Sequence, residues 1–288
     1  MTRRGFTLVE LLIGMILVGL VGGAIYQVLV NSQRVYTLQT ERANLNANNR
    51  AVVAVLPAEL RELDASDAMA SDIVAMSATA VTYKAMRSLF FVCQPPVDNN
   101  HSGTVELWRN RAYGLRPQID AGRDSVFIFA EGALNTRADN AWLHANVSSV
   151  SLGNTCPSGA PGITLQLDGV EPGNGLASVR PGSPVRTFEM VRVTTYTDAL
   201  GDLWLGAQTY TKSGGWTTTQ PLLGPLAASG LQLVYLDSLG NATATPGDVS
   251  RIALTVIART TQPVRGSAGL QPAVDTLVTD IALRNNRR

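Results

Sequence analysis

The chain begins MTRRGFTLVELLIGMILVGLVGGAIYQVLV (residues 1–30), and much of its organisation can be worked out from this stretch. After two arginines and a glycine, residues 6–30 are almost wholly apolar. A helix rises about 1.5 Å per residue, so this run spans about 37 Å, whereas the hydrocarbon core of a bilayer is about 30 Å thick. The stretch therefore predicts a membrane-spanning helix. Arg3 and Arg4 are expected on the cytoplasmic side, where basic flanks are retained.

One carboxylate, Glu10, lies inside this apolar run near its start. An acid at the centre of an inserted helix costs roughly 2.5–3.5 kcal/mol, so such residues usually have a partner or a function. A secretory signal peptide is one simpler interpretation, but its apolar region is shorter, and here the helical pattern continues past the small residues Gly22–Ala24. A plain membrane anchor is the other. Neither explains Glu10.

The segment Gly5–Glu10 reads GFTLVE and follows a short basic leader. It resembles the class III signal of type IV pilins and of the pseudopilins of type II secretion. The resemblance implies that a prepilin peptidase cuts between Gly5 and Phe6 and methylates the new amine of Phe6. It also implies that Glu10 pairs with the Phe6 amine of a neighbouring subunit during assembly. Such a pairing would give the acid the opposite charge that it needs in a low-dielectric environment.

The predicted organisation has four parts: a leader at residues 1–5, a transmembrane and filament-core helix at 6–30, an amphipathic helical stem at 31–63 and a globular domain at 64–288. The stem has apolar residues spaced to one helix face, namely Val35, Leu38, Leu45, Val52, Leu56, Leu60 and Leu63. We expect one helix from about Thr7 to about Leu56, a kink or break near Pro57 and a second short turn at Ala58–Leu63. A coiled coil is the alternative, but asparagines dominate the other positions. We therefore expect the stem to pack on its own globular domain.

Strand signals replace the helical pattern from residue 81 onward, with Gly, Pro, Asn and Ser concentrated in the segments between them. The expected strands are Val81–Lys84, Ser88–Val92, Thr104–Trp108, Ser125–Ala130, Ile163–Leu167, Val185–Thr195, Leu203–Tyr210, Leu231–Leu236, Arg251–Ala258 and Thr276–Leu283. The predicted fold class is α+β, with a long N-terminal transmembrane helix followed by an antiparallel sheet. The order of the last strands is similar to that of the large minor pilins called PilW and of J-type pseudopilins.

The chain has two cysteines, Cys93 and Cys156, and two histidines, His101 and His144. No pair among them has the spacing of a zinc site, so we expect no metal. A disulfide between Cys93 and Cys156 suits a domain outside the cytoplasm. Two unpaired thiols are the alternative.

No constellation of residues indicates catalysis, so we expect neither an enzyme nor a cofactor. His144 is most simply a satisfied or surface histidine. Asp237, Asn241 and Asp248 do not have the spacing of an EF-hand and fit a hairpin loop better. Trp216 is the tryptophan that we expect to be most exposed, and it is a weak candidate for ligand binding. The formal net charge of +1 gives no indication of nucleic-acid binding, although it does not exclude it.

The sequence therefore predicts a minor pilin or pseudopilin that initiates or caps a filament. An alternative is a binding module at the filament tip, either an adhesin or a DNA-binding minor pilin. The expected partners are the prepilin peptidase, other minor subunits, the major pilin and the inner membrane. We expect a single-pass inner-membrane protein with a cytoplasmic N-terminus and an external domain, which later enters a pilus or pseudopilus.

Overall fold

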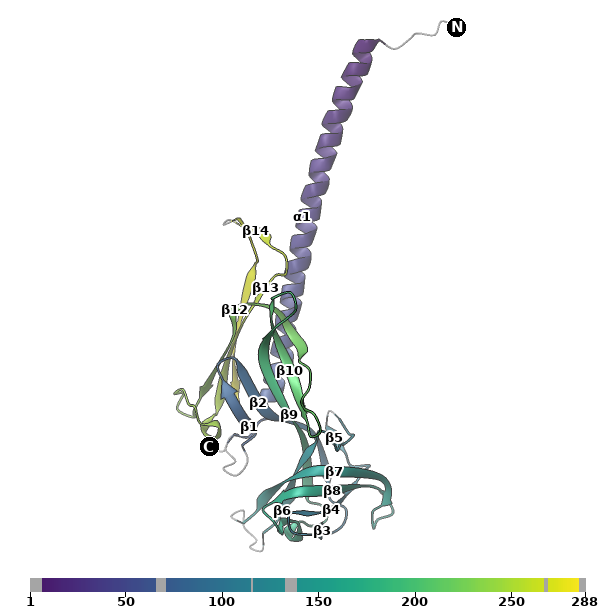
Figure 1. Ribbon diagram of the computed structural model, residues 1–288, viewed down its shortest axis with the longest axis vertical. Coiled ribbons are helices and arrows are strands. Elements are labelled where there is room, and N and C mark those ends of the chain that lie inside the picture. Colours follow the sequence, from purple (N-terminus) through teal and green to yellow (C-terminus); the bar gives the residue numbers. More distant parts are fainter. Residues whose placement is uncertain (1–6, 66–70, 115, 133–138, 267–268, 285–288) are drawn as a thin grey trace, which may run out of the picture.

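The computed structural model describes residues 7–65, 71–114, 116–132, 139–266 and 269–284. One long helix, α1 (Leu8–Arg61), extends from a β-rich body (Figure 1). The predicted α+β class is confirmed, since the strands that follow α1 pair in antiparallel fashion into one large sheet.

The helix α1 continues through Pro57 to Arg61, so the expected end at about Leu56 and a break near Pro57 are wrong. Proline removes one backbone hydrogen bond and disfavours a helix interior. Here Leu56 and Leu60 are buried on the body at 4% and 0% exposure, and Pro57 itself is buried. Burying these side chains offsets the lost hydrogen bond. The expectation that the stem packs on its own domain is confirmed by Leu45, Leu56 and Leu60, whereas the side chain of Val52 lies outside the described part.

The strands are β1 (Ile73–Ser77), β2 (Ala80–Phe91), β3 (Val97–Asp98), β4 (Ser102–Trp108), β5 (Tyr113–Gly114), β6 (Ser125–Ala130), β7 (Ala141–Thr155), β8 (Pro161–Glu171), β9 (Pro184–Thr197), β10 (Leu203–Thr211), β11 (Gly215–Trp216), β12 (Gln220–Leu236), β13 (Arg251–Arg259), β14 (Val264–Gly266), β15 (Gly269–Gln271) and β16 (Val274–Ala282). Two short 3-10 helices lie at Gly175–Ser178 and Pro246–Asp248. Within the described residues, all strands except the β14–β15 hairpin belong to one fourteen-stranded sheet, whose main path is β16-β13-β12-β10-β9-β6-β7-β8-β4-β3.

Three strands differ from the sequence prediction for identifiable reasons. The two segments expected at Val81–Lys84 and Ser88–Val92 are one strand, β2, whose register with β9 shifts between Met86 and Ser88. That irregularity interrupts the alternation that a strand pattern needs. Strand β12 begins eleven residues before the expected segment and also has an irregular register. Strand β7 was not predicted, because only its first half has alternating buried residues.

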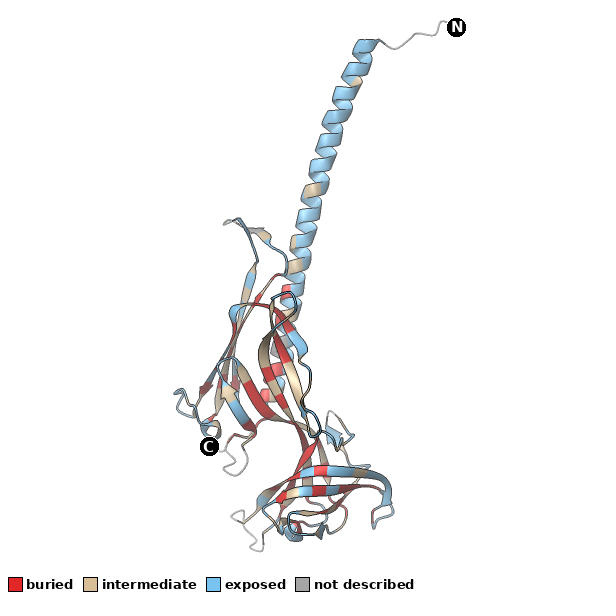
Figure 2. Ribbon diagram, viewed as in Figure 1, coloured by how far each residue is buried: buried red, intermediate tan, exposed pale blue. Residues whose placement is uncertain are grey.

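The body has two lobes with separate hydrophobic cores (Figure 2). The proximal lobe contains the end of α1, β1, β10–β13 and β16, and the distal lobe contains β3–β8. Strands β2 and β9 pair with each other along almost their whole length and run through both lobes. They contribute Tyr83 and Val193 to the proximal core, and Phe90 and Val185 to the distal core. The sheet is therefore continuous although its cores are separate.

Candidate functional site

Glu10 caps the start of α1 together with Thr7. The Thr7 backbone N–H and hydroxyl each lie 3.0 Å from Glu10 Oε2, and the Glu10 N–H donates to Thr7 Oγ1 at 3.3 Å. This reciprocal arrangement is a capping box, which satisfies amide groups that a helix start otherwise leaves free. Gly5 and Phe6 lie outside the described residues. The structure therefore places Glu10 but neither the predicted cleavage bond nor the Phe6 amine.

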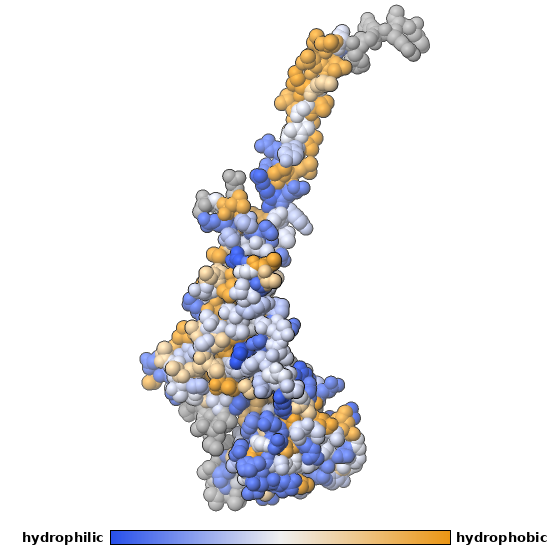
Figure 3. Space-filling model, in the orientation of Figure 1, coloured by the Kyte–Doolittle hydropathy of each residue, from blue (hydrophilic) through white to orange (hydrophobic). Residues whose placement is uncertain are grey.

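The first half of α1 exposes a continuous hydrophobic surface (Figure 3). Leu8 is 81% exposed, Val18 73% and Val28 67%. Among the described residues, α1 is the one helix long and apolar enough to cross a membrane, and none of its most apolar window is buried in the chain. Exposed surface of this extent needs a lipid or protein environment to cover it. This half of α1 is compatible with a single-pass membrane anchor.

Polar side chains fix the second half of α1 to the proximal lobe. The Asn49 amide donates to Asp275 Oδ2 at 2.6 Å, and the Asn48 amide donates to the Gly224 carbonyl at 3.3 Å. At the end of the helix, the Arg284 N–H donates to the Arg61 carbonyl at 2.7 Å. From the sequence, these asparagines could be placed only between the apolar residues of the stem. Their spacing relative to the apolar residues could not show that Gly224 and Asp275 of the body lie close enough to accept hydrogen bonds from them.

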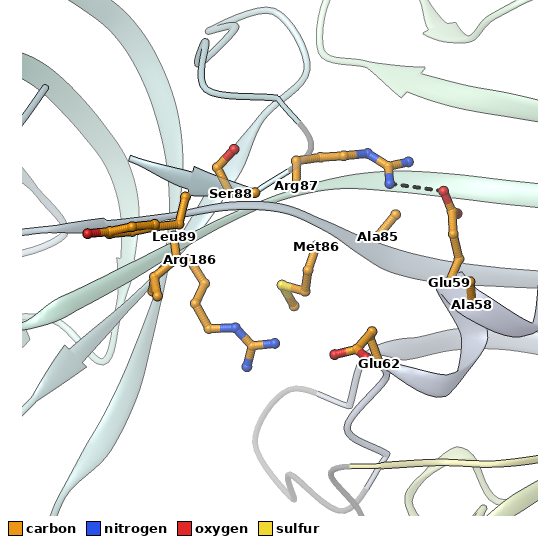
Figure 4. Close-up of a pocket in the computed structure, with 11 residues that line it drawn as sticks. Ala58, Glu59, Glu62, Ala85, Met86, Arg87, Ser88, Leu89 and Arg186 are labelled. Carbon is orange, nitrogen blue, oxygen red and sulfur yellow. Dashed lines mark hydrogen bonds and ion pairs between the residues drawn. The ribbon is translucent and has the colours of Figure 1, made fainter. Parts of the chain in front are cut away.

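A chain of charged groups links the end of α1 to the middle of the body (Figure 4). Arg87 on β2 donates to Glu59 on α1 at 3.1 Å and to Glu189 on β9 at 2.5 Å. Burial opposes the charge of Arg87, but the two glutamates outweigh it and raise the arginine pKa. The Tyr83 hydroxyl also donates to Glu59, at 2.5 Å. Arg87 follows Met86 at the register shift of β2, so this irregularity coincides with the ion pairs that hold the helix end.

These groups border a groove between α1 and the distal end of β2. The groove has a volume of about 480 Å³ and also includes Glu62, Met86 and Arg186. Glu62 and Arg186 extend into it from opposite sides in Figure 4. The groove combines acidic and basic groups with an apolar floor, and Ser88, which also lines it, donates its hydroxyl to the Arg116 carbonyl. It is best understood as part of the junction between the helix and the two lobes.

Lys212 joins the lobes on the other side of β9. It lies in the turn between β10 and β11, and its ammonium donates to the carbonyls of Ala121, Asp124 and Val147 at 2.9, 2.7 and 2.5 Å. All three acceptors belong to the distal lobe. Burial lowers the pKa of the Lys212 ammonium, which remains paired with three carbonyl oxygens. Nothing in the sequence around Lys212 indicated this role, because its partners are 65 to 91 residues away.

Cys93 and Cys156 form a disulfide in the distal lobe, with their Cα atoms 5.8 Å apart. The bond joins the end of β2 to the turn between β7 and β8 and closes a separation of 63 residues. Beside the bond, the Cys93 N–H donates to the Glu106 carbonyl at 2.8 Å.

The remaining residues singled out from the sequence have local roles. His144 lies 5.8 Å from the Phe127 ring and 5.7 Å from the Phe188 ring, and burial lowers its pKa. Asp237 accepts bonds from the Leu239 and Asn241 N–H groups within a turn, as expected for a hairpin loop. Trp216 is half-buried beneath the Arg192 guanidinium. Within the described ranges, no group of three or more His, Cys, Asp or Glu side chains is placed to bind a metal.

Residues 1–26 match the family model described as "Prokaryotic N-terminal methylation motif". No curated protein and no solved structure matches the chain. The motif supports a type IV pilin-like subunit, which is a structural class and not an enzymatic one. The match ends within α1, so it carries no information about the two-lobed body.

Proposed function

We propose that this protein is a minor pilin or pseudopilin that takes part in initiating or capping a type IV pilus-like filament. The observation that carries the proposal is the methylation motif on a helix that continues without interruption into the core of a large body. In this proposal residues 1–5 are a leader, 6–30 span the inner membrane, 31–63 form the stem and 64–288 lie outside. Prepilin peptidase cuts between Gly5 and Phe6 and methylates Phe6.

Glu10 supplies the driving force for assembly in this mechanism. In the uncut chain its carboxylate is held by Thr7. Cleavage creates a positively charged amine at Phe6 in the same membrane environment, and a neighbouring subunit offers that amine to Glu10. Opposite charges attract strongly where the dielectric constant is low. The rigid connection of α1 to the body then transmits the position of the membrane segment to the external lobes.

The shape of the body favours assignment as a W-type or J-type minor subunit over assignment as a major one. The distal lobe extends beyond the C-terminal end of α1, and none of the described side chains of this helix enters its core, so the body is longer than the stem alone would make it (Figure 1). A tip position suits this shape, because a terminal subunit has no later subunit to stack upon it. Its partners would be other minor subunits and the major pilin.

Incorporation of Glu10 variants tests the proposal in the native host. We expect Glu10→Gln to be cut and to reach the membrane normally, but to fall at least about tenfold in sheared filaments, equivalent to about 1.4 kcal/mol. Thr7→Val is the matched control, because it removes the capping hydroxyl and keeps the carboxylate. We expect its incorporation to stay near that of the wild type. Normal incorporation of Glu10→Gln would contradict the proposed ion pair.

A further inference from the structure

The β14–β15 hairpin lies beside α1 at the point where the apolar run ends. It forms a groove of about 780 Å³ with the helix, lined by Val30, Arg34 and Leu38 on α1 and by Val264 and Leu270 on the hairpin. Of the described body, this hairpin reaches furthest toward the N-terminal end of α1 (Figure 1). It therefore lies at the level where the proposed membrane segment, residues 6–30, gives way to the stem.

The hairpin and the residues beside it include several exposed apolar side chains among polar ones. Leu270 is 68% exposed, and Val274, which follows the hairpin, is 60% exposed. Pro263 is also exposed, and Figure 3 shows hydrophobic surface at the hairpin beside the stem. No strand in the described ranges pairs with β14 and β15 other than each other. Leu270 and Val274 therefore keep their exposure in the described chain, whereas Val264 is half-buried.

The depth of this surface matches the interfacial layer of a bilayer. The headgroup regions add about 5–8 Å on each side of the hydrocarbon core. Counting about 1.5 Å per residue from Val30, the backbone of Arg34 lies about 6 Å outside the core, within this layer, and that of Tyr36 about 9 Å outside it, so the Tyr36 side chain enters the layer only by reaching back toward the core. Arginine and tyrosine each have an apolar body and a polar end, which suits them to a membrane–water interface. Tyr36 is 72% exposed, so its side chain is free to reach back in this way.

Glu41 holds the hairpin at this level. Its carboxylate accepts bonds from the Thr261 N–H at 2.9 Å and the Gln262 N–H at 3.3 Å, at the base of the hairpin. Glu41 lies three residues, less than one turn, beyond Leu38 at the end of the groove, so the carboxylate fixes the base while the hairpin extends toward the N-terminal end of α1. This contact couples the hairpin to the helix and not only to β13 and β16.

We propose that the β14–β15 hairpin is a membrane-contact element that rests on the outer surface of the bilayer before the subunit enters a filament. The occupant of the groove region is lipid, with headgroups near Arg34 and Tyr36 and the upper acyl chains near Leu270. The contact would set the depth of the stem and the tilt of the body relative to the membrane. The inference rests on the proposed membrane span.

A single introduced cysteine can report the contact, because the two native cysteines of the chain are both bonded. The full chain, as Leu270→Cys, is labelled with an environment-sensitive fluorophore and reconstituted into vesicles of phosphatidylethanolamine and phosphatidylglycerol. Some vesicles also contain phosphatidylcholine with a quencher high on its acyl chain. Val18→Cys reports insertion of the span. Leu239→Cys, 84% exposed in the turn before β13, is the matched control outside the membrane.

We expect the shallow quencher to reduce emission at positions 18 and 270 and to leave position 239 unchanged. Adding Glu41→Ala is expected to weaken quenching at position 270 alone, because it releases the base of the hairpin. Quenching at 18 with none at 270 would overturn this inference and leave the membrane span intact. No quenching at 18 would overturn the span as well. Shielding of 270 only in assembled filaments would assign the surface to a neighbouring subunit instead of lipid.

Discussion

The proximal and distal lobes stabilise one continuous sheet in different ways. The proximal core is completed by α1, which supplies Leu45, Leu56 and Leu60. Among the side chains that the structure describes, none from α1 enters the distal core, which is instead crosslinked by the Cys93–Cys156 disulfide. The lobe nearest the N-terminal end of α1 therefore depends on that helix, and the lobe furthest from it does not. If α1 moves when a filament assembles, the proximal lobe should be affected first, because its core contains side chains of α1.

The largest expected effect comes from truncating one fully buried leucine in each core, which tests whether the two cores unfold independently. Leu60→Ala in α1 and Leu165→Ala in β8 should each cost about 2–5 kcal/mol, since both side chains are 0% exposed. Hydrogen exchange followed by mass spectrometry on the detergent-solubilised chain resolves where protection is lost. We expect Leu60→Ala to affect α1, β12 and β13, and Leu165→Ala to affect β4, β7 and β8. Equal loss in both lobes from either variant would show that the cores act as one unit.

Removing the disulfide should affect the distal lobe alone. The double variant Cys93→Ser, Cys156→Ser is expected to lose about 2–5 kcal/mol, the usual effect of releasing a long loop. Exchange should rise in β4, β7 and β8 while the end of α1 and β13 stay protected. The reduced wild-type chain serves as the control and should behave in the same way. Increased exchange at the end of α1 would contradict the independence of the distal lobe.

Asp72 gives the proximal lobe its own pH dependence. Its side chain accepts the Asp64 N–H at 2.8 Å, and burial raises its pKa to about 6 from 3.8. The folded chain holds the proton of the Asp72 carboxyl more tightly than the unfolded chain. The contribution of Asp72 to the free energy of unfolding is therefore fully present below pH 4 and falls as the pH rises from about 4 to 6. The difference is on the order of 2–3 kcal/mol. The free energy of unfolding of Asp72→Asn, measured by chemical denaturation relative to the wild type, should therefore be higher at pH 7 than at pH 4. An identical pH dependence in both chains would contradict this.

The smallest effect is expected at the contact between the lobes. Lys212→Met removes three bonds to distal carbonyls and should cost about 1–3 kcal/mol. Spin labels at Leu152→Cys in β7 and Leu239→Cys should then give a broader distance distribution. Lys212→Arg keeps the charge and is the control, with a distribution near that of the wild type. An unchanged distribution in Lys212→Met would mean that β2 and β9 alone fix the lobes.

The sequence was most informative where one periodic pattern extends over many residues. The apolar run and the spacing of Leu45, Leu56 and Leu60 predicted the helix and its buried side, and alternation in β13 predicted that strand. Pro57 led to a wrong prediction of where the helix ends, because the tendency of proline to end a helix is outweighed here by the burial of Leu56 and Leu60 against the body. The two lobes were not predictable, since β2 and β9 enter both cores and no composition change marks the boundary.

The candidate site was predictable only in part for a related reason. Glu10 stands out because a carboxylate in an apolar run is costly, and the motif around it is local. The contacts of Glu41, Asn49 and Lys212 depend on partners that are 65 or more residues away in the chain. A polar residue on a helix or in a turn is ordinarily solvated, so its identity alone gives no sign of such a partner.

The most direct test of the proposed class is the intact mass and N-terminal sequence of the protein extracted from membranes of cells that contain its own peptidase. We expect a mature chain that begins at N-methylated Phe6. A chain that begins at Met1, or near Ile25 as after ordinary signal cleavage, would contradict assignment to a pilin-like filament and leave Glu10 without its proposed partner.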